Sequence, residues 1–118
     1  MFEKNLSISL LLDFYGDVLS DRQNEMLGMY YNEDCSLSEI AENFNISRQG
    51  VRSVLKKGET ILLDMENKLQ LASRFIKVRE KSSEIAFELE KINSDINNDE
   101  ISSKIHSLIR EIQEMANY

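Results

Sequence analysis

No proline interrupts the 118 residues of this chain, and glycine occurs only at positions 16, 28, 50 and 58. Proline and glycine are the residues that most often break or end a helix. With so few of them, and with many Leu, Ile, Glu and Lys residues, the sequence predicts an all-α protein. A hydrophobic content of 42% argues against a disordered chain and is enough for one modest core.

Two helices are expected before residue 35. The first is predicted from about Asn5 to Tyr15, ending at Gly16. Ser20 and Gln23 have the spacing of a capping box, so the second helix starts there and reaches about Tyr31. The residues predicted to face the core are Leu6, Leu10, Leu11 and Phe14 in the first helix, and Met26, Leu27, Tyr30 and Tyr31 in the second.

The stretch SLSEIAENFNISRQGVRSVLKK, residues 36–57, has the pattern of a helix-turn-helix. Ser36 and Glu39 form a second capping box at the start of a short helix, Leu37 to Phe44. Asn45 suits the left-handed conformation that a tight turn needs. Ser47 then caps a fourth helix that shows no break before about Leu71.

The outer face of this fourth helix carries the candidate nucleic-acid contacts. A recognition helix enters the major groove, where Arg can pair with guanine and Gln with adenine, while Lys contacts phosphates. Two serines at the start of the preceding helix could add phosphate contacts. The candidate residues are Ser36, Ser38, Arg48, Gln49, Arg52, Ser53, Lys56 and Lys57.

Charge both supports and limits this hypothesis. The chain has a net charge of −7, which disfavours general binding to nucleic acid. Residues 47–57, however, hold four cations and no acid. The alternative is that the trihelical core is only a packing unit and its basic face a solvated surface.

Beyond about residue 71 the sequence predicts long helices with a repeat of about 3.5 residues, typical of helices packed at a shallow angle. We therefore divide the chain into a helix-turn-helix domain, 1–71, and a C-terminal helical extension, 72–118, with a turn at 97–99. The apolar stripes could form a hairpin within the chain or an interface between two copies. We favour a homodimer, with an interface of Ile85, Leu89, Ile92, Ile101, Ile105, Leu108 and Ile112.

Residues 6–75 resemble the YlxM family of small bacterial proteins. The resemblance lies in LLDFYGDVL, in DRQ before MYYNED, and in SLSEIAE followed by ISRQGV; the last segment also resembles the promoter-reading helix-turn-helix of sigma factors. It implies a helix-turn-helix fold without a wing, DNA binding and transcription regulation, no enzyme activity, and a role in the signal recognition particle pathway. An adaptor that binds the particle's GTPase or its RNA is the alternative. Two positions depart from the family pattern: Asn45, where glycine is common, and Gly50, where alanine is common.

The remaining reactive groups indicate no second site. His106 has no Cys or second His nearby, so we expect neither a metal site nor a cofactor. Acids flank Cys35 and oppose formation of its thiolate. A lone cysteine rules out a disulfide within the chain, no apolar run reaches the ~20 residues needed to cross a bilayer, and we expect a cytoplasmic protein.

Overall fold

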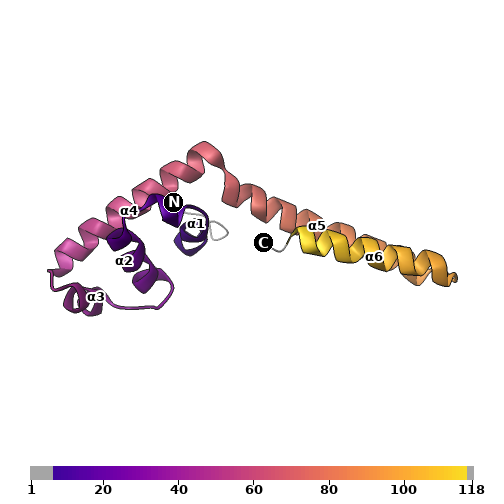
Figure 1. The fold of residues 1–118 in the computed structure, drawn as a ribbon, viewed down its shortest axis with the longest axis horizontal. Helices are drawn as coiled ribbons and strands as arrows, with labels where there is room; N and C mark the ends of the chain where they lie inside the picture. Colours follow the sequence, from indigo (N-terminus) through magenta and orange to yellow (C-terminus); the bar gives the residue numbers. More distant parts are fainter. Residues whose placement is uncertain (1–6, 117–118) are drawn as a thin grey trace. The chain divides into compact units, whose positions relative to one another are not determined.

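The computed structural model describes residues 7–116, and within that range the chain is all-α, as predicted, with no strand. The described residues form two compact units that divide between Ser73 and Arg74. Figure 1 shows the elements in chain order: α1 (Ile8–Tyr15), the 3-10 turn η2 (Gly16–Val18), α2 (Asp21–Tyr31), α3 (Leu37–Phe44), α4 (Arg48–Leu69), α5 (Leu71–Ser94) and α6 (Asp99–Met115).

Both predicted capping boxes are present. The Ser20 hydroxyl accepts from the Gln23 N–H at 3.2 Å, and the Gln23 side chain accepts from the Ser20 N–H at 3.0 Å. Ser36 and Glu39 make the same reciprocal pair, with both distances 3.0 Å. Each capping box provides acceptors for two backbone N–H groups that would otherwise lack a partner at the helix start. For this reason α2 and α3 begin where the local sequence predicts.

The first helix differs from its prediction in start and in buried face. It begins at Ile8 rather than near Asn5, because Ser7 is its cap and accepts from the Leu10 N–H at 3.2 Å. Its buried face is Ile8, Leu11, Leu12 and Tyr15, whereas Leu10 and Phe14 only border the core. Leu6 and Asn5 lie outside the described residues. Both stripes have helical spacing, so only tertiary packing could choose between them.

The core of the first unit surrounds the N-terminal two thirds of α4. Met26 and Leu27 from α2, Ile40 from α3, and Val51 and Leu62 from α4 are fully buried. Tyr30, predicted to face this core, is instead 38% exposed. Consecutive helical residues point about 100° apart, so the half-buried Tyr31 takes the inner position and leaves Tyr30 outside.

A buried carboxylate holds the end of the first unit together. Glu66 of α4 accepts from the Tyr15 hydroxyl at 2.6 Å, from the Ala72 N–H at 3.0 Å, and from the N–H and hydroxyl of Ser73. The Tyr15 oxygen also accepts from the Leu71 N–H at 3.1 Å. Gln70 has a left-handed backbone, φ 56°, and ends α4 one residue before α5 begins. Glu66 therefore caps the first turn of α5 and ties it to α1.

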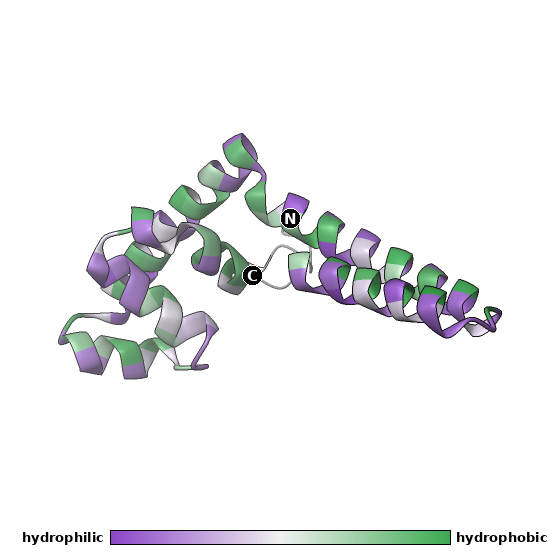
Figure 2. Ribbon diagram, turned by 45° about the vertical axis from the view of Figure 1, so that its right-hand side comes forward, coloured by the Kyte–Doolittle hydropathy of each residue, from purple (hydrophilic) through white to green (hydrophobic). Residues whose placement is uncertain are grey.

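In the second unit, α5 and α6 form an antiparallel hairpin (Figure 2). Asn98 caps α6: its side chain accepts from the N–H groups of Glu100 and Ile101. The residues shielded between the two helices are Ser82, Ala86, Leu89 and Asn93 of α5 with Ile96 just after it, and Ser102, Ile105, Ile109 and Ile112 of α6 with Ala116 at its C-terminal cap. The predicted stripes thus share only some positions with the seam inside the hairpin.

Within residues 7–116 no helix combines the length and the apolar composition needed to cross a membrane.

Candidate nucleic-acid interface

The turn between α3 and α4 has the predicted left-handed residue. Asn45 has φ 56° and ψ 47° and ends α3. The Ile46 N–H returns to the Ala41 carbonyl at 3.0 Å, which satisfies a carbonyl at the helix end and directs the Ile46 side chain toward the core. Ser47 then caps α4 by accepting from the Gly50 N–H at 3.0 Å. The helix-turn-helix pattern is confirmed at each of these positions.

The first three turns of α4 have a buried side and a solvent side. Val51 and Leu55 are 0% and 5% exposed and pack into the core with Ile40 and Ala41 of α3. All the residues that the sequence predicts as contacts on α4 are exposed: Arg48, Gln49, Arg52, Ser53, Lys56 and Lys57. We call these six residues the basic face. Packing α4 through its apolar side therefore turns the basic face outward as one surface.

The cations of the basic face have no carboxylate partner in the described chain. The four ion pairs among residues 7–116 are short-range pairs on α4, α5 and α6, and each of them lies outside residues 48–57. Arg52 makes a weak hydrogen bond to the Gln49 side chain at 3.4 Å. Ion pairing would have to be broken before phosphate could bind, so its absence from this surface leaves the guanidinium and ammonium groups available.

The start of α3 is less suited to phosphate than the sequence suggested. Ser36 and Ser38 are both exposed, but the Ser36 hydroxyl is engaged as the helix cap. The Glu39 carboxylate lies at the same helix end, and its hydrogen bonds with Ser36 lower its pKa. A carboxylate kept ionised there opposes an approaching phosphate, so the positive contribution comes from α4.

Tyr30 is a candidate that the sequence analysis assigned to the core. With Leu37, Arg52 and Lys56 it lines a shallow groove beside the basic face. Its ring packs edge-on against Tyr31, with the centroids 5.0 Å apart. Aromatic rings beside cations are suited to sugar or base contacts. The sequence held no signal that would have found Tyr30, because adjacent helical residues can both be buried, as Met26 and Leu27 of the same helix are.

Gly50 lies in the first turn of α4, between the cap and the basic face. A Cβ placed there would lie 3.3 Å from the Ser47 hydroxyl oxygen and 3.4 Å from the Ile46 Cδ1. The first distance is tighter than ordinary van der Waals contact, and the second is at its lower limit. The glycine that departs from the family pattern therefore sits where the turn packs closely on the helix start.

The other reactive groups are accounted for by local structure. Partial burial, and then the carboxylates of Glu39, Glu33 and Asp34, raise the pKa of the Cys35 thiol, as the flanking acids predicted. His106 is exposed and shares a hydrogen bond with Asn93 at 3.1 Å. In the part of the chain that the structure describes, no three His, Cys, Asp or Glu side chains converge as a metal site would require.

Comparison with known proteins gives a match over most of the chain. The family model described as "UPF0122: Putative helix-turn-helix protein, YlxM / p13 like" matches residues 2–108. A UPF0122 protein of Acetivibrio thermocellus is 40% identical over 115 residues, 95% of this chain and 98% of the relative. UPF0122 proteins of a Thermoanaerobacter species and of Halalkalibacterium halodurans are 42% and 38% identical, over 93% and 92% of this chain and 94% and 96% of their own lengths.

Proposed function

Because the chain belongs to the UPF0122 family of YlxM/p13-like helix-turn-helix proteins, we propose that it binds duplex DNA through the basic face of α4 and acts as a regulator of transcription. The observation that carries this proposal is the position of four unpaired cations, Arg48, Arg52, Lys56 and Lys57, on the solvent side of the helix that follows the turn. A helix-turn-helix places the first turns of that helix in the major groove.

The acidic remainder of the chain decides what kind of binding to expect. With a net charge of −7, most of the surface repels phosphate, so contact is favoured only in the orientation that presents α4. About two to four phosphates per chain can be neutralised by the basic face, which predicts a salt slope of roughly −2 to −4. Affinity should then fall roughly 10- to 100-fold between 50 and 200 mM salt.

The test is a titration of the full chain with duplex DNA at low and moderate salt. An Arg48→Ala/Arg52→Ala variant should lose on the order of 10- to 100-fold in affinity, because each guanidinium contributes a charge contact or a base contact. Its salt slope should become shallower by about 2.

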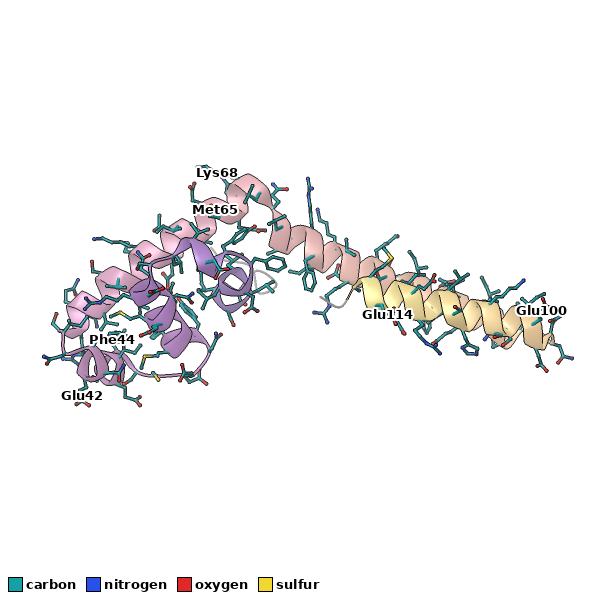
Figure 3. All side chains as sticks on the ribbon, viewed as in Figure 1. Glu42, Phe44, Met65, Lys68, Glu100 and Glu114 are labelled. Carbon is teal, nitrogen blue, oxygen red and sulfur yellow. The ribbon has the colours of Figure 1, made fainter. Side chains whose placement is uncertain are left out.

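A matched control lies at the far end of the same helix. Lys68 is exposed in the last turn of α4, pairs with Asp64 at 3.0 Å, and lies at the opposite end of α4 from Phe44 (Figure 3). Lys68→Ala should bind DNA like wild type, whereas Arg52→Ala, which removes the same charge, should bind more weakly. Equal affinity of the wild type and the Arg48→Ala/Arg52→Ala variant would refute the proposal.

A role in the signal recognition particle pathway rests on the family resemblance alone, and no contact within the described residues identifies such a partner. The titration therefore includes the particle's RNA. Binding to this RNA but not to duplex DNA, lost in the Arg48→Ala/Arg52→Ala variant, would keep the basic face as the site and replace the ligand. A protein adaptor that uses another surface would bind neither nucleic acid.

A further inference from the structure

The α5–α6 hairpin has two edges of opposite character. In heptad letters, the shielded residues are positions a and d, with the pattern continued through Ile96 just after α5 and Ala116 at the end of α6. The a positions are Ala86, Asn93, Ser102, Ile109 and Ala116, and the d positions are Ser82, Leu89, Ile96, Ile105 and Ile112. In an antiparallel pair, the e positions of the two helices meet along one edge, and the g positions meet along the other. The composition of these two edges decides what each can bind.

The g positions are all large and apolar. They are Val78, Ile85 and Ile92 on α5, and Ile101, Leu108 and Met115 on α6, and each is between 42% and 63% exposed. Within each helix they are seven residues apart, about 10.5 Å along the axis. Ile92 and Ile101 are equally far from the turn, as are Ile85 and Leu108, and Val78 and Met115. We call these three levels of paired residues the apolar edge.

The e positions from Ser83 onward are polar. Ser83 and Glu90 of α5 and Gln113 of α6 line one groove, which places both helices' e positions on that edge. His106, also an e position, reaches Asn93 across the hairpin at 3.1 Å. Between Arg74 and Ala116, every exposed large apolar residue except Phe87 belongs to a continuous band on the other edge.

The width of the apolar stripe indicates that further helices cover the apolar edge. Helices that form only a two-stranded pair need apolar residues at a and d, whereas helices in a bundle are apolar at a, d and also e or g. Here the g positions are larger and more apolar than the a positions, which include Ala86, Asn93 and Ser102. This composition is typical of one half of a four-helix bundle.

The size of the apolar edge fits a second copy. Six large side chains, each about half exposed, leave roughly 500 Å² of apolar surface, against the roughly 800 Å² per partner of a standard interface. Monomeric proteins rarely leave a larger continuous patch in water. With the flanking c positions included, two such faces reach the standard size.

The flanking charges are self-complementary. The c positions that border the apolar edge are Arg74, Lys81 and Glu88 on α5, Asp95 just after it, and Lys104 and Glu111 on α6, all exposed. A nucleic acid or an anionic membrane would need a flank of one sign. In a dimer with two-fold symmetry, Lys81 of one copy lies at the same height along the bundle as a glutamate of the other copy, and the same is true of Lys104. This holds whether the α5–α6 turns of the two copies lie at the same end of the bundle or at opposite ends.

We propose that the apolar edge is the interface of a homodimer in which two α5–α6 hairpins form a four-helix bundle. The dimer joins g positions, and Leu89, Ile105 and Ile112 remain in the seam of each hairpin. Because no nucleic acid is needed for this association, the proposal stands or fails independently of DNA binding.

Sedimentation equilibrium of the full chain, under reducing conditions and without nucleic acid, tests the interface. Wild type should have twice the chain mass. Ile85→Asp/Leu108→Asp changes the middle level of the apolar edge and should raise the dissociation constant by more than about 100-fold, because charges would be buried against apolar side chains. Ile85→Ala/Leu108→Ala adds no charge and should raise it by about tenfold or more.

The matched control adds the same charge elsewhere on the hairpin. Phe87 is 59% exposed but lies at a b position, and Ser107 is exposed at an f position. Phe87→Asp/Ser107→Asp should remain a dimer. The proposal would be overturned if the wild type sedimented as a single chain at every concentration. It would also be overturned if the alanine variant had the same dissociation constant as the wild type. The alanine variant provides the test if the aspartate variant loses helix.

Discussion

Gly58 lies where α4 packs directly on Leu27 of α2, and alanine at this position should destabilise the first unit. A Cβ built on Gly58 would lie 2.6 Å from Leu27 Cδ1 and 3.5 Å from Leu27 Cγ. Leu27 is fully buried, so its side chain must shift against close-packed core neighbours to make room. Overpacking of this kind costs about 1 to 3 kcal/mol.

Gly28 provides the comparison that isolates this cost. It also lies inside a helix, and a Cβ there would meet nothing within 4 Å. Replacing glycine by alanine in a helix interior stabilises by up to about 1 kcal/mol at either position. Gly28→Ala should therefore be stabilising by up to about 1 kcal/mol, and Gly58→Ala less stable than Gly28→Ala by about 1 to 3 kcal/mol.

Urea and thermal unfolding of the full chain measure this difference. Tyr15, Tyr30 and Tyr31 lie in the first unit, so tyrosine fluorescence reports mainly on that unit. For a unit of this size, each 1 kcal/mol corresponds to a shift of about 4 to 8 °C in Tm. The two alanine variants should thus differ by roughly 5 to 20 °C. If Gly58→Ala were as stable as Gly28→Ala, α4 would not be packed against Leu27 as described, and the basic face would be positioned by other contacts.

Two further predictions concern the ends of α4. Gly50→Ala should stabilise the chain by less than Gly28→Ala, because its Cβ would lie 3.3 Å from the Ser47 hydroxyl oxygen. The unfolding midpoints of the two variants measure this difference in stability. A larger gain for Gly50→Ala would contradict the crowding at the start of α4. Glu66→Gln should cost about 1 to 3 kcal/mol at neutral pH, because an amide cannot accept all the bonds that the carboxylate accepts. Burial alone would raise the pKa of Glu66, but bonds from Tyr15, Ser73 and Ala72 hold it below the ordinary value. A lowered folded-state pKa means that this stability is present above the unfolded value of about 4.3 and is lost as pH falls through the folded-state value. The difference in urea unfolding midpoint between wild type and Glu66→Gln should therefore narrow below about pH 4. Asp64→Asn, an exposed control on the same helix, should leave the midpoint nearly unchanged. A difference that stays constant with pH would contradict a charged Glu66.

The candidate site could be located from sequence because its signals are local. The box at Ser36 and Glu39, the left-handed Asn45 and the cap at Ser47 each involve residues within a few positions of one another. Their geometry follows from backbone hydrogen bonding, which depends little on the rest of the fold. Once Val51 and Leu55 are placed inside, helical periodicity puts the basic face outside.

Other features could not be predicted because several arrangements satisfy the same pattern. The stripe through Leu10 and Phe14 and the stripe through Ile8 and Tyr15 both fit α1. The second is used because it brings the Tyr15 hydroxyl to Glu66, 51 residues away. Similarly, nothing local distinguishes Tyr30 from Tyr31 as the inner residue of α2.

Glu66 is the clearest example of a residue whose role could not be predicted from sequence. In an acidic, helical chain, nothing in the sequence distinguishes its carboxylate from those of exposed acids. Its partners come from two other helices, Tyr15 from α1 and Ala72 and Ser73 from α5, and the three helices are brought together only when the core closes.

The sequence by itself determined the all-α class, the starts of α2, α3 and α4, and the helix-turn-helix, because caps and periodicity act over one or two turns. The tertiary structure decided which face of α1 is buried, that Gly58 must remain small, and that the hairpin buries its a and d residues while the g residues stay exposed. These outcomes depend on contacts between residues far apart in the chain, and the periodicity of one helix carries no information about which neighbour it will meet.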